Sequence, residues 1–181
     1  MEYITLGKTD LMVSRTAFGA LPIQRIPSIA EASALLRTAW DGGINFFDTA
    51  RSYTDSEEKL GFALDEIRND VIIATKTASR TGKDLKIDLE TSLSNLQTDY
   101  IDLYQLHNPS FVPHPGGADG IYDALLQAKK EGKIRYIGFT NHSRQISLSA
   151  IESGLYDTLQ YPLSYLSRED DLGVAHLCEE K

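Results

Sequence analysis

Short apolar runs recur along this chain at intervals of 24 to 33 residues, and this spacing limits the fold more than any other feature. The runs that start at residues 44, 71, 101, 134 and 158 have the length and composition of buried strands. A strand, a helix and the next strand occupy about 30 residues when the helix returns the chain to a parallel neighbour. Because such crossovers are right-handed, the pattern predicts an α/β fold with one parallel sheet.

Helical stretches lie between these runs. Ser28 and Glu31 form a capping-box pair that opens the first helix. Leu60, Leu64 and Ile67 at i, i+4 and i+7 predict a second helix that includes Ile67. Four more helices are predicted. Leu89, Leu93 and Leu96 indicate the third, and Ile121, Leu125 and Ala128 the fourth, which Gly132 ends. The fifth covers residues 143–153 and ends at Gly154, and the sixth starts near Ser167, with Asp170 three residues on.

Two architectures use successive strand–helix units: an open doubly wound sheet and a (β/α)8 barrel of the TIM type. No G-x-G-x-x-G follows the first strand, which argues against the dinucleotide-binding open sheet. Polar side chains end the strands instead, where barrels carry their chemistry. With "RTAFGA" as a first strand, residues 1–181 predict a single incomplete barrel domain of about six units. The segment "EYITLGKTDLMVS" predicts an N-terminal β-hairpin around Gly7 and Lys8.

Composition and charge limit the cellular compartments and the classes of partner that fit this chain. The 181 residues include one cysteine, Cys178, which excludes an intramolecular disulfide and fits a reducing compartment. No signal-peptide pattern and no membrane-spanning run is present, so we expect a cytoplasmic protein without a membrane partner. The net charge of -8 argues against nucleic acid as a partner.

Three successive strands end on ionisable side chains: Asp48, Lys76 and His107. Side chains two apart share a face of a strand, so all three meet at the carboxyl mouth if those faces line a barrel. Tyr53 lies on the loop after Asp48. We expect the Lys76 ammonium to lower the pKa of Tyr53 from its usual value of about 10, with Asp48 holding Lys76. Tyr53 would then serve as a general acid and His107 would bind a substrate oxygen.

Each of these residues also has an ordinary explanation on its own. An aspartate at a strand end is often a cap or a turn residue, a lysine is usually solvated, and a tyrosine is often a packed loop aromatic. The co-occurrence at three strand ends favours carbonyl reduction, for which the hydride must come from a nicotinamide cofactor. A metal-dependent hydrolase is disfavoured, because His107 and His114 have no acidic partner, so we expect no metal.

Taken together, these motifs resemble the aldo-keto reductase family. "GINFFDTARSYTDSEEKLG" is similar to its first signature, and "GKIRYIGFTNHS" to its second, where Thr140 replaces a usual Ser or Cys and His142 a usual aromatic residue. The resemblance implies a (β/α)8 barrel, with Tyr53 as proton donor, Lys76 and Asp48 tuning it, and His107 orienting the carbonyl of a small-molecule substrate. It places the cofactor against Gly19, Asp48, Thr140, Asn141 and Gln160, and it favours NADPH, with NADH as the alternative.

The resemblance also raises the question of length. Six units are present where the family has eight, and a barrel of this type takes about 250 residues. The seventh and eighth strand loops hold the cofactor phosphates in the family, so two functions remain open: an NADP(H)-dependent carbonyl reductase, or an impaired or non-catalytic barrel with a structural or regulatory role. We expect a fragment, self-association through open sheet edges, or imperfect closure. One cysteine excludes an iron–sulfur cluster.

Overall fold

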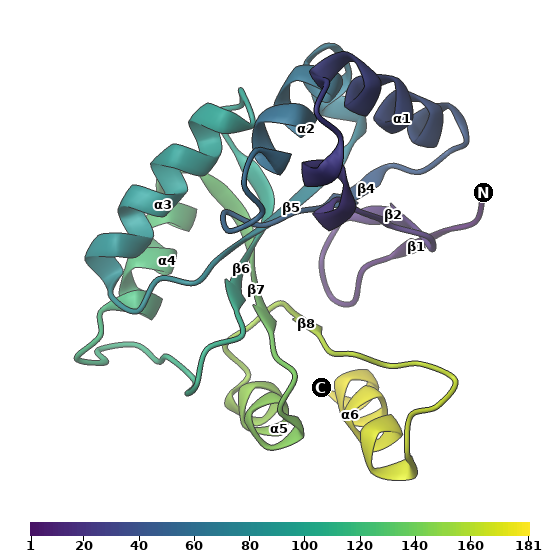
Figure 1. The fold of residues 1–181 in the computed structure, drawn as a ribbon. Helices are drawn as coiled ribbons and strands as arrows, with labels where there is room; N and C mark the ends of the chain where they lie inside the picture. The colour runs from purple at the N-terminus through teal and green to yellow at the C-terminus, as the bar shows by residue number, and fades with distance from the viewer.

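The computed structural model describes residues 1–181 and contains one curled sheet of six parallel strands (Figure 1). The strands follow chain order across the sheet: β3 (Phe18–Gly19), β4 (Phe46–Asp48), β5 (Ile72–Thr77), β6 (Ile101–His107), β7 (Ile134–Thr140) and β8 (Thr158–Gln160). Each strand pairs in parallel with the next. The predicted α/β fold, an incomplete TIM-type barrel, is confirmed.

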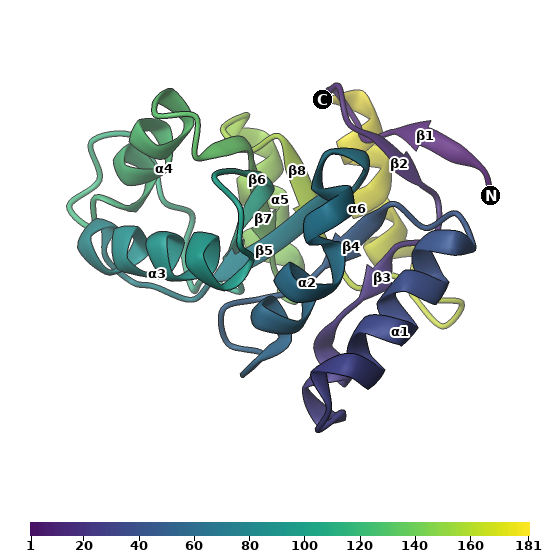
Figure 2. The same ribbon diagram turned by 90° about the horizontal axis from the view of Figure 1, so that it is seen from above.

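Six α-helices return the chain between and after these strands: α1 (Ile29–Asp41), α2 (Ser56–Leu64), α3 (Gly82–Asn95), α4 (Ile121–Lys130), α5 (Arg144–Ser153) and α6 (Glu169–Glu180). The first four lie on the outer side of the curled sheet, and α5 and α6 lie beside each other near β8 (Figures 1 and 2). None of the helices is long and apolar enough to cross a bilayer.

The main core lies between the sheet and helices α1 to α4. It is a cluster of 25 buried side chains in which Phe47, Ile73, Tyr104 and Phe139 contribute from successive strands. These residues alternate along each strand with the residues of the opposite face, such as Lys76 and Gln105. The outward-facing residues therefore supply the hydrophobic core, and the inward-facing residues are left for a polar site.

The N-terminal hairpin is present, with a longer turn than the sequence predicted. Strand β1 (Tyr3–Thr5) pairs antiparallel with β2 (Met12–Ser14). The segment between the strands runs over residues 6–11, and Gly7 has a φ of 56°. Leu11 and Val13 pack with Ile72 in a second, smaller hydrophobic cluster. The hairpin is thereby attached to the amino-terminal end of β5.

Two helix boundaries differ from the prediction. Helix α2 ends at Leu64, and residues 65–70 form a 3₁₀ segment, η2 (Asp65–Asp70), in which Ile67 is non-helical. The Arg68 guanidinium in this segment donates to the Val71 and Tyr100 carbonyls, and these bonds hold the segment in the 3₁₀ conformation. Helix α6 starts one residue later than the Ser167–Asp170 pair suggested, because the Asp171 carboxylate accepts from the Arg168 N–H.

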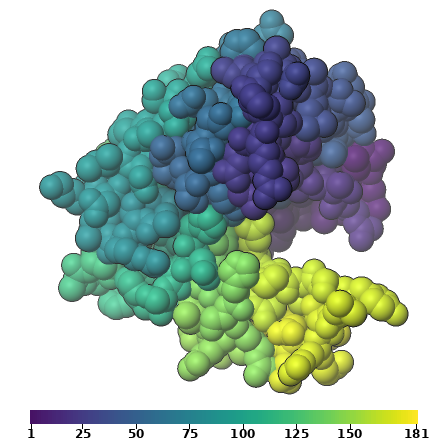
Figure 3. Space-filling model, viewed as in Figure 1, coloured from purple at the N-terminus to yellow at the C-terminus, as the bar shows by residue number.

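The sheet has two edges, β3 and β8. In the space-filling view the C-terminal residues stand apart from the N-terminal segment across an indentation on one side of the molecule (Figure 3). Unpaired strand edges can pair with another chain, so self-association through β3 and β8 stays a prediction.

Candidate active site

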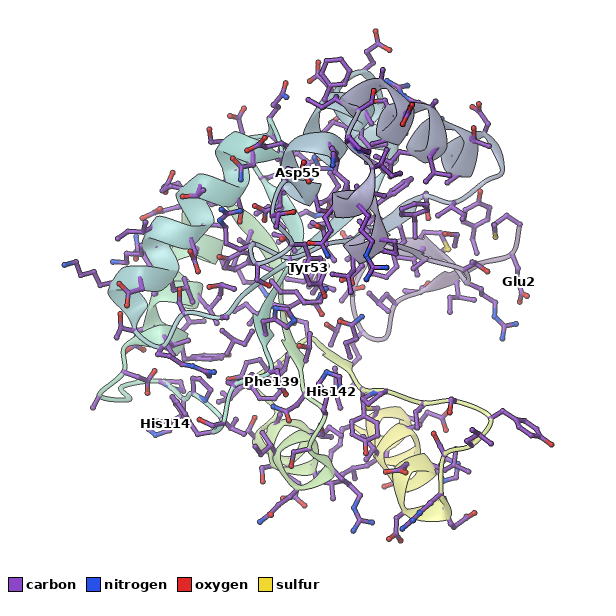
Figure 4. All side chains as sticks on the ribbon, in the orientation of Figure 1. Glu2, Tyr53, Asp55, His114, Phe139 and His142 are labelled. Atoms are coloured by element: carbon purple, nitrogen blue, oxygen red, sulfur yellow. The ribbon has the colours of Figure 1, made fainter.

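The carboxyl ends of β4, β5 and β6 bring three charged or polar side chains together. The parallel ladder sets Asp48 opposite Ala74, Lys76 opposite Gln105 and His107 opposite Thr140. Lys76 therefore stands two residues beyond the level of Asp48, and His107 stands two residues beyond the level of Lys76, on the same inward face. The loop after β4 then carries Tyr53 over the same end of the sheet, near the centre of the view in Figure 4.

A buried ion pair is the central electrostatic interaction of this site. Lys76 Nζ lies 2.6 Å from Asp48 Oδ2 and donates to the Thr49 carbonyl at 2.7 Å. The Lys76 side chain is 3% exposed and the Asp48 side chain 16%. Burial lowers the pKa of Lys76 below its ordinary value, and the Asp48 carboxylate opposes that shift. Asp48 therefore keeps the ammonium charged in a poorly solvated position.

Two amides complete the surroundings of Asp48. Gln105 Nε2 donates to Asp48 Oδ1 at 3.1 Å, and Gln160 Nε2 lies 3.5 Å from Asp48 Oδ2. Gln105 is absent from the predicted site, although its position in the sequence indicates it. It stands two residues before His107 on β6, so it shares the inward face.

Tyr53 lies between Lys76 and His107. Lys76 Nζ is 5.4 Å from the centre of the phenol ring, and the His107 ring meets it edge-on at 5.8 Å. Burial, and then the Asp48 carboxylate, raise the pKa of Tyr53 above its ordinary value. The expected lowering of this pKa by Lys76 is therefore wrong. The reason is that burial disfavours the charged phenolate and that the Asp48 carboxylate repels it.

His107 is held as a neutral imidazole at neutral pH. Burial, and then the Lys76 ammonium, lower its pKa below the ordinary value, against a smaller opposite effect of Asp48. Ser52 Oγ lies 3.4 Å from His107 Nδ1, on the side of the ring that the Tyr53 loop covers. A neutral imidazole has one donor and one acceptor nitrogen, so His107 can donate a hydrogen bond to a carbonyl oxygen.

These side chains line one cavity of about 330 Å³. Of the residues predicted from sequence, Asp48, Tyr53, Lys76, His107, Thr140, Asn141 and Gln160 line it. Gly19 does not: it pairs with Asp48 on the edge strand β3, and its Cα faces open space. His114 lies on the outer loop, away from Tyr53 and His142 (Figure 4).

The segment after β8 forms the far wall, which sequence analysis did not anticipate. Tyr161, Pro162 and Leu163 line the cavity with His142, the residue after Asn141. The Tyr161 hydroxyl donates to Asp171 on α6 at 2.7 Å, which attaches this wall to the last helix. The wall adds apolar surface to a cavity that is otherwise largely polar.

The donors and acceptors beside the cavity suit a carboxamide. Asn141 is 2% exposed; its amide donates to the Pro109 carbonyl at 2.7 Å, and its oxygen accepts from the Ser143 N–H at 2.8 Å. These bonds fix the orientation of the amide and leave one N–H and one lone pair free. The Thr140 hydroxyl and the Gln160 amide line the same cavity, so the group predicted to hold a nicotinamide fits one chemically.

The fold and the site define an incomplete parallel β/α barrel with a polar centre at the carboxyl ends of its strands. The sequence profile described as "Aldo/keto reductase family" matches residues 18–181. The chain belongs to this family, which confirms the resemblance seen in the sequence.

Individual relatives agree with this assignment. The chain is 36% identical to L-galactose dehydrogenase of Arabidopsis thaliana over 91% of its own length and 56% of that protein. It is also 36% identical to aldo-keto reductase YhdN of Bacillus subtilis, over 96% of this chain and 57% of the relative. A holo-form aldo-keto reductase from Bacillus halodurans superimposes with a TM-score of 0.85 at 28% identity, covering 98% of this chain and 64% of that one. The chain thus spans a little over half the length of these curated relatives.

Proposed function

We propose that this chain carries the catalytic half of an NADP(H)-dependent oxidoreductase that reduces aldehyde or ketone carbonyls to alcohols. The observation that carries the proposal is the convergence of Asp48, Tyr53, Lys76 and His107 on one cavity. Membership of a family of reductases and dehydrogenases supports it. When bound, the reduced nicotinamide would supply the hydride that no side chain can supply.

The residues of this chain would divide the remaining work. His107 would donate a hydrogen bond to the carbonyl oxygen and fix its position in the cavity. Tyr53 would deliver the proton to the same oxygen as negative charge develops there. Lys76, kept charged by Asp48, would stabilise the phenolate that Tyr53 leaves behind. Thr140, Asn141 and Gln160 would hold the carboxamide of the nicotinamide.

The phenol of Tyr53 is a weaker acid in this site than a free tyrosine, because burial and Asp48 raise its pKa. In the proposed reaction the growing negative charge on the substrate oxygen draws the proton, so the phenol need not ionise beforehand. Lys76 then matters after the transfer, when the phenolate lies near its ammonium.

A fluorescence titration with NADPH and an assay of aldehyde reduction test the proposal. We expect Tyr53→Phe to abolish reduction and to leave the Kd for NADPH nearly unchanged. Tyr165→Phe is the matched control, because Tyr165 is fully exposed. Equal loss of binding and turnover in Tyr53→Phe would mean that Tyr53 has a structural role. The substrate panel should include L-galactose with NADP⁺, after the name of the Arabidopsis relative.

A second candidate is a barrel that keeps the site residues and acts as a structural or regulatory subunit. Two observations favour it: the sheet is open at β3 and β8, and the pKa of Tyr53 is raised. The same titration separates the candidates. No binding of NADPH at high micromolar concentration would exclude the enzyme for this chain and leave the second candidate.

A further inference from the structure

Helix α2 contains a fully buried carboxylate that the proposed chemistry does not use. Glu57 is 0% exposed and lies one residue inside the helix. Its Oε2 accepts from Arg51 Nη1 at 2.9 Å and from Asn95 Nδ2 at 3.2 Å, and its Oε1 accepts from Thr75 Oγ1 at 2.7 Å. A buried charge is tolerated only where it is paired and hydrogen-bonded, and Glu57 meets both conditions.

The partners of Glu57 belong to the segments that carry the proposed catalytic residues. Arg51 lies on the loop after β4, two residues before Tyr53. Thr75 is the residue before Lys76 on β5. The backbone N–H of Arg51 also donates to the Lys76 carbonyl at 2.9 Å. The Glu57 carboxylate therefore adds a side-chain link between the loop of Tyr53 and the strand of Lys76, beside this backbone bond.

Other buried contacts at the start of α2 attach it to a different part of the fold. Ser56 Oγ donates to the Ala20 carbonyl, and Lys59 Nζ donates to the Ile23 carbonyl, both at 3.0 Å. These bonds reach the segment that follows β3 and do not reach β5. They hold the outer end of the loop. On the β5 side, the loop is held by backbone bonds, such as that from Arg51 to Lys76, and by the side-chain contacts of Glu57.

The loop itself is in a conformation that needs such support. Thr54, the residue after Tyr53, has a φ of +42°. A β-branched residue rarely adopts this left-handed region, and it persists there only where the surroundings enforce it. Without its anchors the loop would relax to another conformation, and Tyr53 would move with it.

We propose that Glu57 is a positioning residue that holds Tyr53 over Lys76 through Arg51 and Thr75. The inference rests on the proposed function in its claim that this arrangement serves proton transfer. The placement of Tyr53 by Glu57 can be measured without any cofactor.

The test compares Glu57→Gln with Glu58→Gln. Glutamine keeps the size of the side chain and removes the charge that pairs with Arg51. Glu58 is the neighbouring residue on the exposed side of α2, so its variant is the matched control. The protein is labelled with 3-fluorotyrosine, and Tyr53→Phe identifies the fluorine resonance of Tyr53. We expect this resonance to shift or broaden in Glu57→Gln, while the resonances of the distant tyrosines stay in place.

Turnover provides the second measurement. A displacement of the proton donor by about 1 Å costs on the order of 100-fold in rate, so we expect kcat to fall roughly 10- to 100-fold in Glu57→Gln. The Kd for NADPH should stay unchanged, because no cofactor-facing residue is altered. A general loss of structure would instead change both values and all tyrosine resonances.

The outcomes are separable. A Tyr53 resonance and a kcat equal to those of Glu58→Gln would overturn the proposal. If Glu57→Gln does not fold, Arg51→Lys replaces it: the charge remains, the planar donor is lost, and the same changes are expected at smaller size. If the wild type binds no NADPH, the proposed function fails, and the fluorine spectra alone still decide whether Glu57 positions Tyr53.

Discussion

Replacing Asp48 by asparagine tests whether the Asp48 carboxylate stabilises the buried Lys76 ammonium. The change keeps the shape of the side chain and an oxygen for Gln105, which now binds Asp48 at 3.1 Å. It removes the carboxylate that lies 2.6 Å from Lys76 Nζ. The Thr49 carbonyl at 2.7 Å then remains as the partner of the Lys76 ammonium. The variant therefore leaves a nearly buried charge without a counter-charge.

The expected magnitude follows from burial. Breaking a buried ion pair by removing one partner costs about 3–5 kcal/mol. Because Asp48 is 16% exposed and water reaches one side of the pair, we expect the lower end, about 3 kcal/mol in the free energy of unfolding. Glu90→Gln is the control. The Lys133–Glu90 pair is also 2.6 Å long, and its side chains are 35% and 60% exposed, so little change is expected.

The pH dependence of stability tests the direction of this effect. Burial lowers the pKa of Lys76 in the folded protein, and Asp48 is the group that raises it. Removing Asp48 lowers that pKa further. A lysine with a lowered pKa binds fewer protons when folded than when unfolded, so its penalty is full below the folded pKa and fades as the pH rises toward the unfolded value. The stability difference between wild type and Asp48→Asn should therefore shrink as the pH rises toward the ordinary lysine pKa of 10.5.

Urea unfolding at a series of pH values from neutral up to the ordinary lysine pKa of 10.5 measures this difference. Trp40, the single tryptophan, packs against the main core and reports unfolding by fluorescence. Far-ultraviolet circular dichroism checks that the transition is shared by the whole chain. Equal stability of wild type and Asp48→Asn at pH 7, or a difference that stays constant up to the ordinary lysine pKa of 10.5, would refute the argument that Lys76 is charged and dependent on Asp48.

Two further predictions concern packing and protonation. Gly61→Ala should destabilise the protein by about 1–3 kcal/mol, because the new Cβ would collide with the backbone of Asn95 and Leu96, whereas Gly173→Ala meets open space and should stabilise α6 by about 0.5–1 kcal/mol. Thermal melting compares the two, and similar shifts would contradict the close packing of α2 on α3. Burial and Lys76 lower the pKa of His107, so its folded form resists protonation and the wild type should lose stability as the pH falls from about 6.5 toward 5. His107→Gln should flatten that part of the stability profile in urea unfolding, and an unchanged slope would speak against a neutral, buried His107.

The strands and the placement of their terminal side chains could be predicted because both follow from local rules. The period of two along a strand assigns Lys76 and Gln105 to one face, and parallel pairing puts the carboxyl ends of neighbouring strands together. Those rules hold whatever the surrounding helices do. They are sufficient to bring Asp48, Lys76 and His107 to one end of the sheet before any coordinate is known.

Properties that depend on exact environment could not be predicted in this way. The direction of the Tyr53 pKa shift depends on how deeply the phenol is buried and on how near the Asp48 carboxylate lies, and neither follows from sequence spacing. The wall formed by Tyr161, Pro162 and Leu163 depends on where the chain turns after β8. The break in α2 before Ile67 depends on Arg68 finding carbonyl acceptors in later segments.

The burial of Glu57 could be predicted in part from the sequence. The pair Glu57 and Glu58 looks like an ordinary acidic helix start, in which either carboxylate would face water near the positive end of the helix. The helical period separates them, because Glu57, Leu60 and Leu64 stand at i, i+3 and i+7 and so lie on the buried face. A carboxylate in the apolar stripe of a helix must find a charged partner, and Arg51 is the basic residue nearest in the preceding loop. Periodicity can therefore reveal a buried charge that composition hides, and in this chain that charge connects the tyrosine loop to the lysine strand.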